Sequence, residues 1–325
     1  MGLKKVIKAI EENSKFLITS HINLEADALG SELAMAKLLK DEGKQVVVVN
    51  EDKVPKEYSF LPGTKEIKQP KEDLFSLLKR ENFDVFTVLD CSDLNRCGKA
   101  KDLFIEDKLI LNIDHHRANK RFGQINWLEP DSSSCCEMIY KLYKALNKPI
   151  EKDIAVLLYT GILTDTGSFH YPNTTGFTHK VISELLQFKL PISDIYHRIY
   201  ESIPYSDVKL IPQILSSLKK DASGSIFYLT MDRKTLKRKK SHYDLTENIL
   251  NFVRSIRRAN LVILFKEVNL KEVRVNLRSK EGFDVARLAR IFGGGGHRTA
   301  AGCTINRELE VAKSLVLEKA RELLR

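Results

Sequence analysis

Imidazole and carboxylate side chains meet in residues 111–117, which read L-N-I-D-H-H-R. They end a short apolar run, residues 108–113, of the kind that forms a buried strand. An acid and two imidazoles at the end of a buried strand are costly to desolvate without a partner. A divalent metal ion suits this set of side chains. Taken alone, the triplet Asp114, His115 and His116 is explained equally well by a salt-bridged loop.

Three further apolar runs end in the same kinds of side chain. Residues 16–19 lead to His21, Glu25 and Asp27, residues 83–89 lead to Asp90, and residues 154–163 lead to Asp165. Ligands of open α/β sheets bind outside the carboxyl ends of the strands. This repetition favours a metal site over a salt-bridged loop. The candidate ligands are His21, Glu25, Asp27, Asp90, Asp114, His115, His116 and Asp165.

The candidate ligands are oxygen and imidazole donors without a thiolate, which suits Mn²⁺, Fe or Zn²⁺, with Mg²⁺ possible. They exceed what one ion needs, and two ions about 3.5–4 Å apart are the usual arrangement for phosphoryl hydrolysis. Asp90 could bridge such a pair. His116 could bind phosphoryl oxygens or protonate the leaving group. Asp114 could instead orient a histidine without touching metal.

The elements that must position these residues alternate along the first half of the chain. Apolar periodicity predicts strands at 16–19, 45–49, 83–89 and 108–113 and helices at 1–13, 28–42, 71–80, 132–147, 152–163 and 178–188. Alternation of this kind predicts a mainly parallel sheet covered by helices. Ser134 and Glu137 have the spacing of a capping box at a helix start, although these serines could also face a phosphate.

The pattern changes after residues 190–220, which contain Pro191, Pro204 and Pro212. Strands are predicted at 225–231, 261–268 and 272–277, the last two as an antiparallel hairpin, and helices at 284–292 and 307–325. The expected fold class is therefore α/β: a mainly parallel-sheet domain over residues 1–189, a helical linker over 190–220, and a smaller α+β domain over 221–325.

A glycine-rich stretch, residues 293–302, lies in the second half. The backbone N–H groups of Gly293 to Gly296 are predicted to be open to an anion, which would make this loop a phosphate cradle rather than a flexible turn. His297 and Arg298 follow its four consecutive glycines, and Arg278 and Ser279 end the earlier run V-R-V-N-L-R-S. The candidate substrate-binding residues are Arg278, Ser279, Gly294, Gly295, Gly296, His297 and Arg298.

Composition narrows the class of protein. The 325 residues carry a formal charge of +10, which favours anionic partners such as nucleotides and nucleic acid. Two basic runs, residues 233–240 and 254–258, could attract nucleic acid, although solvated helix faces explain them more simply. Five cysteines without a C-x-x-C pair argue against a disulfide framework or a structural zinc site. With no apolar run of about 18 residues and no signal peptide, we expect a cytoplasmic protein with no membrane association.

Five segments in a fixed order resemble the DHH family of phosphoesterases. They read H-I-N-L-E-A-D-A-L-G-S (21–31), V-L-D-C-S-D (88–93), N-I-D-H-H-R (112–117), G-I-L-T-D-T-G-S-F (161–169) and G-G-G-G-H-R-T-A-A-G (293–302). The last resembles the hallmark of the DHH-associated C-terminal domain. The resemblance covers nearly the whole chain. Within the family, the length of this chain and its pair of domains are most similar to those of the bifunctional oligoribonuclease and pAp phosphatase (nano-RNase) type.

The resemblance implies two Mn²⁺ ions and an active site in the cleft between the domains. By position, His21, Glu25 and Asp90 would hold one ion, and Asp27, Asp90, His115 and Asp165 the other. The family's first motif usually has Pro-Asp where this chain has Leu24 and Glu25, so the carboxylate is kept here but the side chain is longer by one methylene.

The function implied is that of a Mn²⁺-dependent phosphodiesterase. It would degrade short oligoribonucleotides, including linear dinucleotides, to mononucleotides and convert 3′-phosphoadenosine 5′-phosphate (pAp) to AMP. Asp114 and His116 would act in catalysis, and a homodimer is compatible with the sequence. The alternative is a cyclic dinucleotide phosphodiesterase. A pyrophosphatase would lack the glycine-rich loop, and a nucleic-acid-binding module without catalysis would not need the ligand set.

Overall fold

The computed structural model describes residues 2–104, 108–239, 245–280 and 282–324. The chain divides into two compact units, Met1–Ile199 and Tyr200–Arg325. Of the helices in the stretch 190–220, α7 (Ile192–Tyr200) reaches the end of the first unit, and α8 (Tyr205–Val208) and α9 (Ile211–Ser216) belong to the second.

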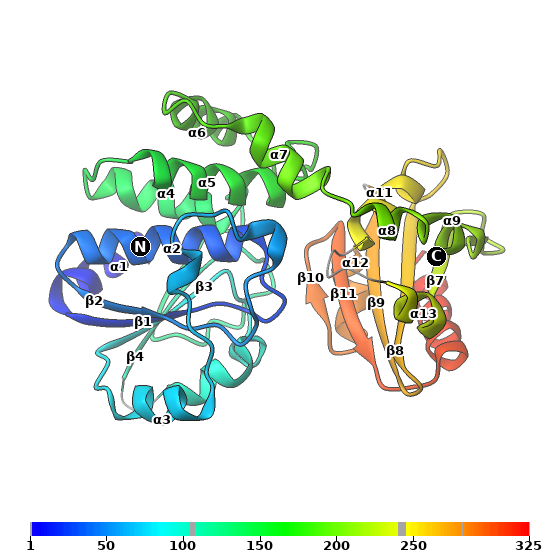
Figure 1. The fold of residues 1–325 in the computed structure, drawn as a ribbon, viewed down its shortest axis with the longest axis horizontal. Coiled ribbons are helices and arrows are strands. Elements are labelled where there is room, and N and C mark those ends of the chain that lie inside the picture. The colour runs from blue at the N-terminus through cyan, green and yellow to red at the C-terminus, as the bar shows by residue number, and fades with distance from the viewer. Residues whose placement is uncertain (1, 105–107, 240–244, 281, 325) are drawn as a thin grey trace. The chain divides into compact units, whose positions relative to one another are not determined.

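The first unit is built on a parallel sheet with strand order β2-β1-β3-β4-β5 (Figure 1). The strands are β1 (Lys15–Thr19), β2 (Gln45–Val48), β3 (Val85–Leu89), β4 (Leu109–Asp114) and β5 (Ile125–Leu128). All neighbouring strands run parallel, as predicted. The order reverses between β1 and β3, where doubly wound sheets bind ligands. β5 was not predicted, because its four residues include the polar Asn126 and form no apolar run.

Helices cover this sheet. They are α1 (Gly2–Glu12), α2 (Ala26–Asp41), α3 (Glu72–Arg80), α4 (Cys135–Ala145), α5 (Lys152–Asp165) and α6 (Gly176–Leu186), with 3₁₀ segments at Lys56–Tyr58, Thr64–Glu66 and Leu94–Leu103. Figure 1 shows α2, α4 and α5 on one side of the strands and α3 on the other. Two glycines allow α2, α4 and α5 to approach closely. A Cβ on Gly161 would lie 2.3 Å from the Cys136 Sγ, and one on Gly30 would lie 2.6 Å from the Leu157 carbonyl oxygen.

The second unit contains a mixed sheet with strand order β10-β11-β9-β8-β7-β6. Its strands are β6 (Lys219–Lys220), β7 (Ile226–Met231), β8 (Leu261–Asn269), β9 (Glu272–Ser279), β10 (Gly295–Gly296) and β11 (Ala300–Ile305). β8 and β9 form the predicted antiparallel hairpin. The end of the stretch expected as a loop, residues 300–302, instead lies in β11 and pairs with β9, because its small residues fit between neighbouring strands.

The two faces of this sheet bury separate cores. Residues such as Ile263, Phe265 and Val275 pack with α12 (Val285–Ile291) and α13 (Leu309–Leu324). Val262 and Leu264, which alternate with them along β8, pack with α9 and α11 (Thr246–Arg254). A short helix, α10 (Arg233–Arg238), precedes α11. No helix among the described residues is long and apolar enough to cross a membrane. All five cysteines are buried and outside any disulfide.

Candidate metal and phosphoester site

The first unit gathers the predicted ligands at one edge of its sheet. His21 follows β1, Asp90 follows β3, and His115 follows β4, at the carboxyl ends of three neighbouring strands. Asp27 comes from the first turn of α2 and Asp165 from the last residue of α5. The backbone of Asp90 lies in the left-handed region, with φ of 51°, which few non-glycine residues adopt. Strained positions of this kind concentrate at functional sites.

His115 lies at the centre of the carboxylates. Its Nε2 is 3.4 Å from Asp165 Oδ2, 3.5 Å from Asp90 Oδ1 and 3.8 Å from Asp27 Oδ2. His21 approaches from the other side, with its Nε2 3.5 Å from Asp90 Oδ2. Asp90 therefore has one histidine on each carboxylate oxygen. This is the residue that the sequence suggested as a bridge between two ions.

Backbone carbonyls orient both histidines. Nδ1 of His115 donates to the carbonyl oxygen of Ser132 (3.2 Å), and Nδ1 of His21 donates to that of Ile22 (2.7 Å). With the proton on Nδ1, the neutral ring presents the Nε2 lone pair to the carboxylate cluster. Histidines that bind metals generally have such a partner on the second ring nitrogen.

Asp27 is held by a helix from a distant part of the sequence. Its two oxygens accept hydrogen bonds from the backbone N–H groups of Cys135 (2.7 Å) and Cys136 (2.8 Å), the first residues of α4. The positive end of the helix dipole therefore lies against the carboxylate. Ser134 caps the same helix, its Oγ accepting from the Glu137 N–H, as the capping spacing predicted. The role of Cys135 and Cys136 has no signal in the sequence, since only backbone atoms take part.

Burial and mutual charge shift the pKa values of the carboxylates and of His115 in this cluster. Burial and the neighbouring Asp90 charge raise the pKa of Asp27 to about 6. Burial raises the pKa of Asp165 well above its ordinary value. Burial lowers the pKa of His115, but the Asp165 and Asp90 carboxylates outweigh burial and raise that pKa well above its ordinary value. Burial opposes ionisation of Asp90, but the neighbouring His115 and His21 imidazoles bring its pKa well below the ordinary value. The negative charge of Asp27, Asp90 and Asp165, the first two of them buried, is therefore only partly balanced by the two histidines.

The donor set fits a divalent cation. Asp90 Oδ1 is buried and has no hydrogen-bond partner among the described residues. Within the first unit, two groups of potential ligand atoms each lie within 4.8 Å of one another: Asp27, His115 and Asp165 form one, and Asp90, Asp114 and His116 the other. Carboxylate oxygens with imidazole nitrogens suit Mn²⁺, Fe, Zn²⁺ or Mg²⁺. Glu25 is exposed and belongs to neither group. The residue at which this chain departs from the family motif therefore lies outside the cluster.

A chain of hydrogen bonds runs from His116 into the core. Its Nδ1 donates to Asp114 Oδ1 at 2.7 Å, and Asp114 Oδ2 accepts from Asn119 Nδ2 at 2.5 Å. The same amide group lies 2.8 Å from Asn112 Oδ1, and the Asn112 amide donates to the carbonyl oxygens of Val88 and Cys91. Asp114 is fully buried, and His116 lowers its pKa against the effect of burial. This geometry matches the orienting role that the sequence left open for Asp114. Asn119 and Asn112 were not predicted.

The predicted substrate-binding residues lie together in the second unit, but several of their polar groups are already paired. The N–H groups of Gly293 and Gly294 donate to the carbonyls of Arg290 and Ala289, so the prediction that they are open to an anion is wrong for these two glycines. They instead close the end of α12. Gly295 and Gly296 pair with β11. A Cβ on Gly294 would lie 2.2 Å from the Gly302 carbonyl oxygen, so this glycine serves close packing.

The four other predicted substrate-binding residues, whose side chains are polar, differ in exposure. Ser279 is buried, and its Oγ donates to the Phe283 carbonyl oxygen at 2.7 Å. Arg278 pairs with Glu247. His297 is half-buried and Arg298 exposed. These two residues are therefore the better candidates for contact with a ligand.

Comparison with known proteins agrees with this architecture. The DHH family, N-terminal domain, matches residues 15–162, and the DHHA1 domain matches residues 209–325. The bifunctional oligoribonuclease and PAP phosphatase NrnA of Thermus thermophilus is 30% identical, over 98% of this chain and 93% of its own. The Bacillus subtilis protein of the same name is 28% identical, over 93% and 92%. An exopolyphosphatase-related protein from Bacteroides fragilis superposes with a TM-score of 0.87 at 28% identity, over 99% and 95%.

The chain belongs to the DHH family and is a phosphoric ester hydrolase. Its two units correspond to the family's DHH and DHHA1 domains, as the sequence predicted.

Proposed function

We propose that this protein hydrolyses short oligoribonucleotides, including linear dinucleotides, to mononucleotides and converts pAp to AMP. The observation that carries the proposal is the buried cluster of Asp27, Asp90, His115 and Asp165, with His21 beside Asp90. The names of the relatives that match nearly the whole chain support the choice of substrates.

The same cluster is the proposed cation site. His21, Asp27, Asp90, His115 and Asp165 would hold divalent ions, with Mn²⁺ as the first candidate. Glu25 would join them only if its exposed side chain turned inward. Bound ions would polarise the phosphoryl oxygens and make a water molecule acidic enough to act as the nucleophile at neutral pH.

The protein's own residues would handle the leaving group. When water adds to phosphorus, a P–O bond forms to the water oxygen, and the bond from phosphorus to the ribose oxygen breaks. That ribose oxygen must gain a proton. Asp114 keeps one proton on Nδ1 of His116, so the second proton of the charged ring would be donated from Nε2. The buried Asp114 carboxylate thus fixes the tautomer and the orientation of the His116 ring.

The decisive experiment is a hydrolysis panel with Mn²⁺ present. The substrates are pAp, a 5′-phosphorylated linear diadenylate, a long RNA, cyclic di-AMP and pyrophosphate. We expect rapid turnover of pAp and the diadenylate. Greater activity on cyclic di-AMP would favour the alternative function of a cyclic dinucleotide phosphodiesterase, and greater activity on pyrophosphate would reject nucleotide specificity altogether.

His115→Ala tests the cation assignment separately, with His197→Ala, an exposed histidine on α7, as the control. We expect the first variant to lose turnover and measurable Mn²⁺ binding by calorimetry. Full activity of His115→Ala would contradict the assignment.

A further inference from the structure

The positive charge of this protein is confined to one unit. Residues 1–199 contain 28 Lys and Arg against 29 Asp and Glu, whereas residues 200–325 contain 25 against 14. The first unit therefore has a formal charge of −1 and the second of +11. An excess of this size on about 126 residues attracts polyanions.

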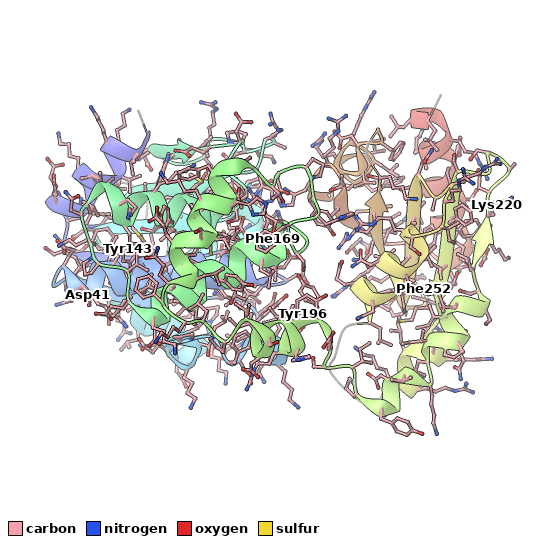
Figure 2. The ribbon with its side chains drawn as sticks, turned by 90° about the horizontal axis from the view of Figure 1, so that it is seen from above. Asp41, Tyr143, Phe169, Tyr196, Lys220 and Phe252 are labelled. Carbon is pink, nitrogen blue, oxygen red and sulfur yellow. The ribbon has the colours of Figure 1, made fainter. Side chains whose placement is uncertain are left out.

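An aromatic side chain lies exposed within this basic unit. α11 buries Ile249, Leu250 and Val253 against the sheet but leaves Phe252 64% exposed. Figure 2 labels Phe252 on this helix. Arg257 and Arg258, in the short segment that joins α11 to β8, are both exposed. Proteins bind single-stranded nucleic acid by combining exposed aromatic rings, on which bases stack, with cationic side chains that contact the phosphates.

This surface continues into the predicted substrate-binding residues of the same unit. Lys280, which follows Arg278 and Ser279, donates from Nζ to the Ile256 carbonyl oxygen at 2.7 Å and from its backbone N–H to the Asn260 carbonyl oxygen at 3.0 Å. Arg278 pairs with Glu247 in the first turn of α11. Glu247 offsets one positive charge, but it lies at the other end of the helix from Arg257 and Arg258.

We propose that Phe252, Arg257 and Arg258 form a binding surface for single-stranded RNA. It would hold nucleotides of an oligonucleotide that lie beyond those bound at the site of hydrolysis. The role of this surface in turnover rests on the proposed function, whereas its ability to bind RNA does not. A substrate with a single nucleoside, such as pAp, has no second base to stack on Phe252 while its own nucleoside is bound at the site of hydrolysis. An oligonucleotide of five residues offers further bases for Phe252 and further phosphates for the two arginines.

The test compares Phe252→Ala and the double variant Arg257→Gln/Arg258→Gln with the wild-type chain. The matched control is Lys234→Gln/Lys237→Gln, which removes two exposed charges from α10 in the same unit. KM and kcat are measured for pAp, a 5′-phosphorylated diadenylate and a pentaadenylate. For the pentaadenylate we expect KM to rise about tenfold in Phe252→Ala, the effect of losing one stacked base, with the pAp KM unchanged.

The double variant should also flatten the dependence of the pentaadenylate KM on salt, more than the control does. Unfolding midpoints establish that the variants are folded, which the exposure of these side chains favours. An equal rise of KM on pAp and pentaadenylate, or an equal effect of the control, would overturn the surface.

Direct binding separates this inference from the proposed function. Fluorescence anisotropy of a labelled pentaadenylate, recorded with EDTA so that no hydrolysis occurs, should show tighter binding to the wild-type chain than to Phe252→Ala. If the wild-type chain failed to hydrolyse pAp and the diadenylate, the proposed function would fall while this difference would still support the surface. Equal affinities would reject the surface whatever the activity.

Discussion

At the scale of single residues, Asp114 illustrates how burial gives a side chain one role. It is fully buried, accepts from His116 on one oxygen and from Asn119 on the other, and so has its position fixed. Its contact with His116 sets which ring nitrogen carries a proton. A carboxylate in this position orients the imidazole rather than reacting itself.

Asp114→Asn tests this role. The amide keeps the size of the side chain but removes the negative charge that holds the ring proton on Nδ1. We expect kcat on pAp to fall about 100-fold or more, in the range that general acid catalysis supplies, with a small change in KM. Asp131→Asn, at an exposed ion pair with Arg117, is the control and should leave kcat unchanged. Equal kcat in Asp114→Asn and the wild type would show that His116 needs no orienting carboxylate.

Glu32 is a second buried acid whose protonation can be tested. It lies on α2, is fully buried, and its Oε2 accepts from Asn50, which in turn accepts from the Ser20 backbone N–H beside His21. Burial raises its pKa from the ordinary 4.5 to about 8, against the hydrogen bond from Asn50. The folded state therefore binds this proton more tightly than the unfolded state does.

The consequence is a loss of stability with rising pH. The contribution of Glu32 to the free energy of unfolding is fully present below about pH 4.5 and is lost as pH rises through about 8. In Glu32→Gln this loss should vanish, so that the variant gains stability relative to the wild type between pH 6 and pH 9. Denaturant unfolding with EDTA present measures the free energy of unfolding at each pH. The control is Glu72→Gln, which changes an exposed acid on α3. A constant difference between variant and wild type across this range would contradict the prediction.

At the scale of elements, the contact among α2, α4 and α5 decides whether the site can form. Asp27 and Asp165 come from two of these helices, and the third supplies the N–H groups that hold Asp27. Gly161 lies where the three meet, because a Cβ there would be 2.3 Å from Cys136 Sγ and 2.9 Å from Asp27 Oδ1. The helices can approach this closely only without a side chain at that position.

Gly161→Ala should therefore destabilise the protein despite the better helix propensity of alanine. Overpacking in a close-packed core costs about 1–3 kcal/mol, and the displacement of Asp27 should also weaken Mn²⁺ binding. Gly176→Ala is the matched control, because a Cβ at that position meets nothing within 4 Å. Chemical denaturation and calorimetry measure the two effects. Unchanged stability and Mn²⁺ affinity in Gly161→Ala would mean that the helices can separate at no cost.

At the scale of the whole molecule, cation binding and folding should be linked. The buried carboxylates repel one another, so a cation that binds only the folded state should stabilise it. We expect the unfolding midpoint of EDTA-treated protein to rise when Mn²⁺ is added in excess. Asp165→Asn, which removes one carboxylate charge from the cluster, should show a smaller rise. The same rise in both proteins would place the stabilising ion elsewhere.

The sequence by itself determined which side chains are available and near which elements they lie. Apolar runs that end in His21, Asp90 and His115 predicted strands whose carboxyl ends would meet, and this was confirmed in the parallel sheet. Periodicity is a local property, so it predicts helices and the longer strands well. Short or small-residue strands such as β5 and β11 carry little of this signal.

Only the tertiary structure decided how these residues are held. The Asp27 carboxylate meets the start of α4 across 108 residues of sequence. The amide of Asn119 supports Asp114, and the N–H groups of Gly293 and Gly294 close α12 rather than facing an anion. Such contacts depend on how whole elements pack and involve mainly backbone atoms, which every residue type supplies. The types of ligand are therefore readable from the sequence, whereas their orientation and their hydrogen-bond partners follow from packing.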